Sequence, residues 1–210
     1  MPILLGAAIG YLLGAVPVGL IAGRLTRGID IREYGSHRTG ATNALRTLGS
    51  RTAAVVFLLD VAKGVLSVLA ARLLFGDYPL VEWGAAAAGF AAIVGHNWSV
   101  FIRFTGGRGV STSAGALGAM SPWTLVVIAP IVFAVIWRWR YVSLGSIAGA
   151  LSAPVITALL AAVGAASVPA IAYAAASGLL VTVAHGDNIG RLRAGTERKV
   201  GQKEAVSGGG

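Results

Sequence analysis

The sequence contains no cysteine, and only 8 of its 210 residues are aspartate or glutamate. Without thiols the chain forms no disulfide, uses no thiolate nucleophile and ligates no metal through sulfur. It also lacks an HExxH motif, other metal-ligand pairings and the GxSxG elbow of serine hydrolases. These absences exclude the common metal and nucleophile chemistries, and we expect no metal and no cofactor.

Hydrophobic residues are abundant instead, at 56%, whereas charged residues make up 12% and the mean hydropathy is +0.77. That composition is typical of a polytopic membrane protein. The formal net charge is +9, but the basic residues lie in short loops between apolar segments, as in cytoplasmic loops that face an anionic leaflet. No soluble basic domain is present, so we expect no nucleic-acid partner.

The apolar segments and the basic loops predict a topology. The first 23 residues carry no charge, and Arg24 and Arg27 follow directly, which predicts a first span with its N-terminus outside. Between Val110 and Ile136 a single crossing would place neighbouring arginines on opposite sides. Ser121-Pro122 therefore predicts two short helices joined by a turn. We expect seven spans, over residues 1–23, 52–74, 80–94, 113–120, 122–137, 144–163 and 168–184.

We therefore predict an all-α integral membrane protein with seven transmembrane helices, an outside N-terminus and a cytoplasmic C-terminus. It forms one domain over residues 1–206, followed by a flexible tail at 207–210. Gly6, Gly10 and Gly14 repeat at every fourth residue and predict close helix packing. Asp60 and Lys63 lie three residues apart within an apolar span, either as a structural ion pair or as one wall of a site.

Most other polar residues fall in the inner loops. The segment from Gly106 to Thr112 combines three glycines, Arg108 and two hydroxyls, which suits a phosphate because the backbone N–H groups are accessible and arginine offers a planar fork of donors. Ser111 or Thr112 is a candidate cap of the following helix. The candidate binding residues of these loops are Ser36, Thr42, Asn43, Arg46, His96, Gly106, Gly107, Arg108, Gly109, Ser111, Asn188 and Arg191, and His185 joins them at the end of the last span.

These residues carry a resemblance. Gly35-Ser36 with Gly40 to Arg46, Gly95-His96 with Gly106 to Val110, and His185 with Asn188 and Lys199 resemble the three motifs of the bacterial acyl-phosphate:glycerol-3-phosphate acyltransferase family, commonly called PlsY. The similarity runs over nearly the full length and in the same order. It implies transfer of a fatty acyl group from acyl phosphate to the 1-hydroxyl of sn-glycerol 3-phosphate, giving lysophosphatidic acid and phosphate at the start of phospholipid synthesis.

The resemblance also implies roles and a location. Ser36, His185 and Asn188 match catalytic positions, Ser36 and Arg46 match residues that hold glycerol phosphate, and the loop around Arg108 matches a phosphate site. The implied partners are glycerol 3-phosphate, acyl phosphate and the lipid bilayer, in the bacterial cytoplasmic (inner) membrane with the site facing the cytoplasm. An acyl phosphate is already activated, so positioning and charge neutralisation suffice for the reaction. The hydroxyl proton goes either to His185 or, the interpretation we favour, to a phosphate oxygen of the donor.

The chain departs from the family pattern at three positions. His37 and Arg38 replace a usual Gly-Asn pair, and Arg108 replaces a usual lysine. Arginine binds phosphate through two donors and is bulkier than lysine. His37 and Arg38 either crowd the glycerol-phosphate site or add a charge to it, with a different acceptor or lower activity as the consequence.

Two other functions fit parts of the sequence. A small transporter of an anionic phosphorylated metabolite would also use inner-face arginines, but it predicts polar residues at the midplane and an internal repeat, and the sequence shows neither. A CDP-alcohol phosphotransferase requires several aspartates on adjacent helical turns, whereas the aspartates here are isolated.

Overall fold

The computed structural model describes residues 2–202, and most of that range is helical. The predicted tail at 207–210 and the predicted domain end at residue 206 lie outside the described residues. The α-helices are α1 Pro2–Ala15, α2 Val18–Arg27, α3 Ala41–Thr47, α4 Ser50–Phe75, α5 Val81–Asn97, α6 Val110–Met120, α7 Pro122–Trp139, α8 Val142–Ala162, α9 Val168–Ala184 and α10 Gly186–Arg193. Two short 3₁₀ helices, Ile31–Glu33 and Val100–Ile102, lie in the loops.

The first apolar segment is divided into two helices rather than being continuous. Helix α1 ends at Ala15, and α2 begins at Val18, directly after Pro17. Proline has no N–H to donate to the preceding turn and clashes with it, so the helix breaks there. The break leaves backbone carbonyls of this turn available to other donors, and one side chain uses them, as described below.

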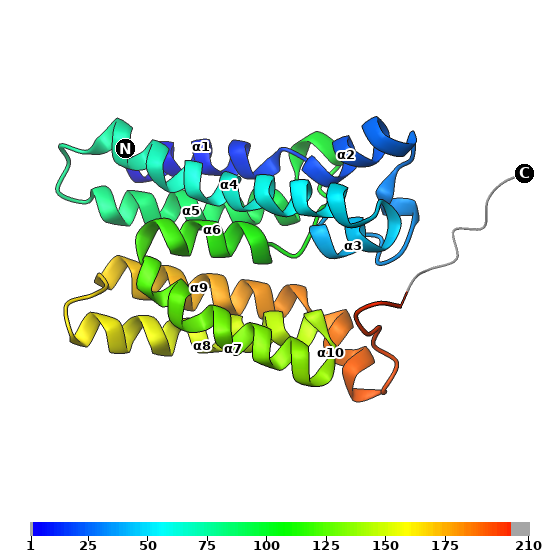
Figure 1. The fold of residues 1–210 in the computed structure, drawn as a ribbon. Coiled ribbons are helices and arrows are strands. Elements are labelled where there is room, and N and C mark those ends of the chain that lie inside the picture. The colour runs from blue at the N-terminus through cyan, green and yellow to red at the C-terminus, as the bar shows by residue number, and fades with distance from the viewer. Residues whose placement is uncertain (1, 203–210) are drawn as a thin grey trace, which may run out of the picture.

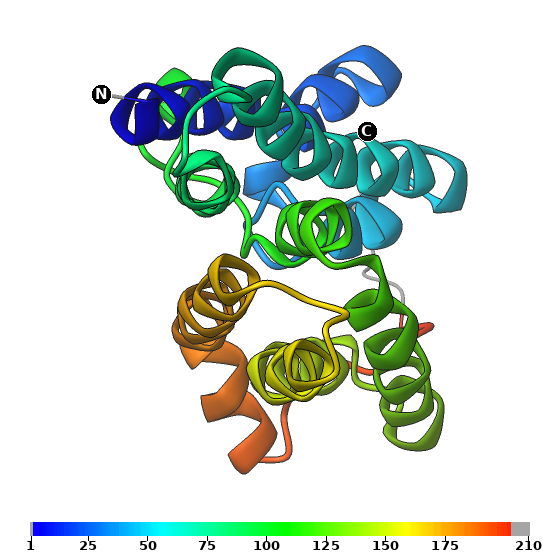
Figure 2. The same cartoon turned by 90° about the vertical axis from the view of Figure 1, so that its left-hand side faces the viewer.

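The helices form two groups that run alongside each other (Figure 1). Helices α1, α4, α5 and α6 make the first group, with α1 packed on α5 and α4 packed on α6. Helices α7, α8 and α9 make the second, with α8 packed on both α7 and α9. The end view in Figure 2 shows α6 at the boundary, where the chain passes from the first group to the second through the turn at Ser121.

Small residues set the spacing of the first group. A Cβ added at Gly10 would overlap the backbone of Ala88, and one at Gly14 would overlap Ala92, both on α5. The glycine repeat therefore brings the two backbones into direct contact, as its spacing predicted. Larger side chains would separate the helices and widen the bundle.

Helix lengths set limits on membrane crossing. Within residues 2–202, four candidate spans are long and apolar enough, namely 3–27, α4, α7 and α8. There are five if α9 and α10, which are bent by 58°, count as one span. The predicted short pair is confirmed, with α6 starting three residues before the expected position and α7 at Pro122. Eleven residues give α6 a length of about 16 Å, well under the ~30 Å hydrocarbon core.

Polar elements gather at one end of the bundle. Helices α2, α3 and α10 lie at that end in Figure 1, whereas the turns after α4, α6 and α8 lie at the other. All the arginines and lysines of the described residues are at or near the polar end, except Lys63 and Arg72, which lie within α4. This is the charge segregation that the sequence predicted.

Candidate active site

A cavity of about 540 Å³ opens between the two helix groups and extends inward from the polar end. Its polar part is lined by residues of the loop before α3, by the start of α6 and by the α9–α10 junction. Its deeper part is lined by apolar side chains of α6, α7 and α8, among them Leu117, Ile128 and Phe133. A ligand with a charged head and an apolar chain would fit this division.

Asn43, near the start of α3, organises the loop that precedes it. Its side-chain amide donates to the carbonyls of Ile31, Tyr34 and Arg38 at 2.8–3.1 Å, and its Oδ1 accepts from the Ser36 N–H at 2.9 Å. The side chain is buried, so these bonds satisfy groups that water does not reach. Asn43 thereby fixes the backbone of Ser36, which lines the cavity.

The glycine loop packs on His96. The Gly107 N–H donates to the His96 carbonyl at 3.0 Å, and a Cβ at Gly107 would overlap the imidazole. The expectation of a Ser111 or Thr112 cap was wrong, because Gly109, with φ of 76°, occupies the N-cap position and α6 has no side-chain cap. The first N–H groups of α6 precede the bond that Ser113 donates to Gly109, so they remain available at the cavity.

Asp60 and Lys63 are both an ion pair and part of the cavity region. Lys63 Nζ lies 2.9 Å from Asp60 Oδ1 and 3.0 Å from His96 Nδ1. It also donates to the carbonyls of Gly14 and Val16 at 3.0 Å, which the break between α1 and α2 leaves exposed to it. Asp60 lines the cavity, whereas Lys63 does not. Asp60 and Lys63 therefore form a structural ion pair, and Asp60 also belongs to the wall of the candidate site.

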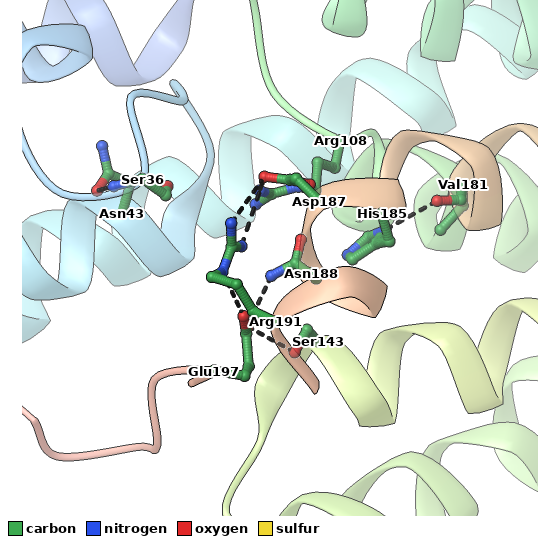
Figure 3. Close-up of polar contacts among 10 residues, drawn as sticks. All are labelled: Ser36, Asn43, Arg108, Ser143, Val181, His185, Asp187, Asn188, Arg191 and Glu197. Carbon is green, nitrogen blue, oxygen red and sulfur yellow. Dashed lines mark hydrogen bonds and ion pairs between the residues drawn. The ribbon is translucent and has the colours of Figure 1, made fainter. Parts of the chain in front are cut away.

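Arg108 lines the cavity and is held there by an ion pair. Its Nη2 lies 2.6 Å from Asp187 Oδ2, and Arg191 contacts the same oxygen at 3.3 Å (Figure 3). Burial opposes ionisation of Asp187, but the hydrogen bond and charge of Arg108, with the charge of Arg191, outweigh it and keep the pKa of Asp187 below its usual range. The Nε of Arg108 is buried without a hydrogen-bond partner in the described chain, which leaves one donor of the fork unused.

Glu197 joins three donors and orients Asn188. Its Oε1 accepts from Ser143 at 2.8 Å and from Asn188 Nδ2 at 2.6 Å, and its Oε2 accepts from Arg191 Nε at 2.7 Å (Figure 3). Burial opposes ionisation, but these bonds prevail and hold the pKa of Glu197 below its usual range. Because the amide nitrogen of Asn188 is committed to Glu197, its Oδ1 is the acceptor left over, and Oδ1 is buried without a partner among residues 2–202.

His185 follows α9 directly and lines the cavity. Its Nδ1 lies 2.8 Å from the Val181 carbonyl, which only accepts, so Nδ1 carries the hydrogen and Nε2 of the neutral ring is an acceptor (Figure 3). Burial, together with the nearby charge of Arg108, lowers the pKa of His185. The ring is therefore neutral at pH 7 and able to accept a hydrogen bond from a hydroxyl.

The cavity brings together most of the residues that the sequence singled out. Its lining includes Ser36, Thr42, Asn43, Arg46, His96, Arg108, Gly109, Ser111, His185 and Asn188. Gly106, Gly107 and Arg191 lie outside the lining and support it, the glycines against His96 and Arg191 against Asp187 and Glu197. Among the described residues no group of three or more His, Asp or Glu side chains is placed to hold a metal ion.

The candidate site residues predicted from the sequence omitted three residues that the structure places at this site: Ser143, Asp187 and Glu197. Glu197 is one of few carboxylates in the chain, and its place among arginines of the last loop was the available signal. Ser143 begins a hydrophobic helix and carries no such signal. His37 is exposed, with φ of 57°, and does not line the cavity, so it does not crowd the site, whereas Arg38 lines it and adds a charge.

Comparison with known proteins gives a consistent result. The family described as glycerol-3-phosphate acyltransferase matches residues 4–195. A glycerol-3-phosphate acyltransferase of a Thermoanaerobacter species is 44% identical over 202 residues, covering 96% of this chain and 98% of that protein. One from Synechococcus elongatus is 43% identical over 201 residues, covering 94% of each chain.

Solved structures agree with the sequence relatives. The crystal structure of PlsY (YgiH), an integral membrane glycerol 3-phosphate acyltransferase, in its glycerol 3-phosphate form matches with a TM-score of 0.84 and 35% identity, and covers 96% of both chains. Its lysophosphatidic acid form matches with a TM-score of 0.83 and 34% identity over the same shares. The fold and the sequence therefore lead to the same family.

Proposed function

The chain belongs to the glycerol-3-phosphate acyltransferase family, and from this premise we propose its reaction in detail. It is a multi-pass membrane enzyme that acylates glycerol 3-phosphate and forms lysophosphatidic acid. The donor is an acyl phosphate, and the acyl group is transferred to the 1-hydroxyl, releasing inorganic phosphate. The observation that carries this proposal is the cavity, whose arginine-lined polar end continues into an apolar channel.

The geometry favours direct transfer without a covalent enzyme intermediate. Arg108 and the first N–H groups of α6 offer donors to a phosphoryl group at the junction of the polar and apolar parts. The acyl chain lies between α6, α7 and α8. Because an acyl phosphate is a mixed anhydride, alignment of the two substrates and stabilisation of the leaving phosphate provide the main catalytic effect.

We assign Ser36, Thr42 and Arg46 to the acceptor's phosphate and His185 with Asn188 to its hydroxyl. His185 Nε2 and Asn188 Oδ1 are both acceptors on residues that line the cavity, so we assign them to orient the attacking O–H. The lowered pKa of His185 makes it a weak base, since a general base works best with a pKa near the working pH. The proton therefore passes to a phosphate oxygen of the donor.

The topology follows from the charge distribution. We propose seven spans, formed by 3–27, α4, α5, α6, α7, α8 and α9, in the bacterial cytoplasmic membrane. The polar end faces the cytoplasm, because it carries nearly all the arginines and lysines of residues 2–202. The absence of cysteine makes the test direct: a cysteine at Asp77 should react with an impermeant thiol reagent in intact cells, and one at Arg51 only after permeabilisation.

The reaction is tested with purified protein in detergent, given palmitoyl phosphate with and without glycerol 3-phosphate, and no metal or CoA. We expect phosphate release that depends on the acceptor and is matched mole for mole by lysophosphatidic acid. Arg46→Ala and Arg108→Ala should each lower kcat/KM about a hundredfold, since each removes a charge-assisted bond to phosphate. Normal turnover in both variants would show that the site assignment is wrong.

A further inference from the structure

Three guanidinium groups line the polar end of the cavity, those of Arg38, Arg46 and Arg108. The carboxylates of the same lining are Asp60 and Glu197. Asp60 pairs with Lys63, and both oxygens of Glu197 accept from other side chains. The cavity therefore presents more positive than negative charge to a ligand.

Arg38 differs from Arg108 in its partners. Arg108 pairs with Asp187, whereas no ion pair of Arg38 occurs within residues 2–202. Its side chain is half-buried at the cavity wall rather than extended into solvent. A half-buried cation is less hydrated than one in bulk water, and without a carboxylate its charge is not neutralised. An anion bound in the cavity would stabilise the Arg38 guanidinium in both respects.

The backbone around Arg38 is anchored on both sides. Its carbonyl accepts from Asn43 Nδ2 at 2.8 Å. The preceding His37 is held in the left-handed conformation, with its ring nitrogen 2.9 Å from the Arg32 carbonyl. The following Thr39 is buried, and its N–H donates to the Gly106 carbonyl at 3.4 Å. Arg38 therefore belongs to a fixed loop that is tied to the glycine loop.

Arg38 is also close enough to Arg108 for the two charges to interact. After burial, the charge of Arg38 is among the influences that lower the pKa of the Arg108 guanidinium. Repulsion between two like charges is unfavourable. An anion bound between them would remove that repulsion and gain two attractions at once.

We propose that Arg38 is a third phosphoryl-binding residue of this site and sets the affinity for a phosphorylated substrate. This rests on the proposed function, in which both substrates carry a phosphoryl group with up to two negative charges. Arg46 and Arg108 alone carry two positive charges and leave up to half of that negative charge unbalanced. Arg38 acts on binding and not on the chemical step, since neither the hydroxyl-orienting pair nor the α6 N-terminus depends on its side chain.

The test compares Arg38→Asn and Arg38→Lys with Arg51→Asn, which removes one positive charge from an exposed residue at the start of α4 that does not line the cavity. KM is measured separately for glycerol 3-phosphate and palmitoyl phosphate, together with the inhibition constant of inorganic phosphate. We expect Arg38→Asn to raise the KM of one or both substrates and the inhibition constant about tenfold, with kcat within twofold. Arg38→Lys should recover part of the loss, and Arg51→Asn should match the wild type.

The pattern of KM identifies which phosphoryl group Arg38 contacts. If only the KM for glycerol 3-phosphate rises, Arg38 contacts the phosphoryl group of the acceptor. If only the KM for palmitoyl phosphate rises, Arg38 contacts that of the donor. Values for Arg38→Asn within twofold of the wild type throughout would overturn the proposal. If the wild type shows no acceptor-dependent turnover, the proposed function fails. The role of Arg38 is then decided by calorimetric binding of inorganic phosphate to the wild type and to Arg38→Asn. Equal affinities of the two proteins would overturn the proposal.

Discussion

Replacing Glu197 by glutamine tests whether the site depends on an oriented Asn188. The carboxylate accepts from Ser143, Asn188 and Arg191, and glutamine has a single oxygen and a pair of N–H donors in its place. At least one of the three donors then faces another donor. Losing one charge-assisted hydrogen bond of about 1.5–3 kcal/mol releases the Asn188 amide, so we expect kcat to fall roughly tenfold to a hundredfold.

The same variant makes a pH prediction. Burial raises the pKa of Glu197, but the three bonds lower it more, so the pKa in the folded protein lies below its unfolded value. The stability from this carboxylate is therefore complete above the unfolded pKa and is lost as pH falls through the folded one. Glu197→Gln lacks this dependence, so its Tm should lie below that of the wild type at pH 7 and approach it as the pH falls below about 4.5.

The assays are acceptor-dependent phosphate release at neutral pH and thermal unfolding in the same detergent from pH 8 down to about pH 2.5, so that the series extends well below the unfolded pKa of a glutamate. Glu33→Gln is the matched control, because Glu33 is exposed at the end of a 3₁₀ helix and does not line the cavity. Glu33→Gln should change neither kcat nor the Tm. Wild-type kcat in Glu197→Gln, or a Tm difference that does not vary with pH, would refute the reasoning.

Two further variants test the support of the site. Lys63→Met should destabilise the fold by about 3–5 kcal/mol, because it leaves Asp60 buried without its cation. Adding Asp60→Asn should recover part of this stability, as measured by thermal unfolding. Effects of the two substitutions that simply add would contradict a coupled ion pair. Gly109→Ala should lower turnover at least tenfold, because a Cβ at this N-cap of α6 would overlap Ile93 of α5 and shift the start of α6. Gly164→Ala, with a similar φ of 77° and open space around it, should keep full activity.

Helix positions could be predicted because each depends on a local pattern. Helix α9 occupies the predicted residues, and α7 begins at the predicted Pro122. The break at Pro17 was missed because the hydropathy of the segment continues through it, although proline itself was the signal. Crossing the membrane depends on the thickness of the bilayer around each helix as well as on the pattern, which is why the short α6 is harder to assign than α4.

The site could be predicted in its residue types and less well in its connections. Arg108 and His185 were found because glycine loops and polar residues after apolar spans are visible in the sequence. The partners of Lys63 could not be found in this way, because His96 is 33 residues away in the sequence and Gly14 is 49 residues away. Nor could the sequence reveal the bonds of Asn43, which lines the cavity and whose amide donates to backbone carbonyls of the loop while its Oδ1 accepts from the Ser36 N–H; its role in substrate binding stays a prediction.

The Arg108–Asp187 ion pair is one that a bound phosphate could replace at a small cost in free energy. Arg108 belongs to the first helix group and Asp187 to the start of α10, and Asp187 is 42% exposed. An ion pair with one partner in water contributes roughly 0–1 kcal/mol, whereas a phosphate dianion in the cavity meets the buried part of the same guanidinium and its unused Nε. We therefore expect phosphate to compete favourably with Asp187 for Arg108. When it does, Asp187 keeps Arg191 as a partner, so no carboxylate is left unpaired by substrate binding.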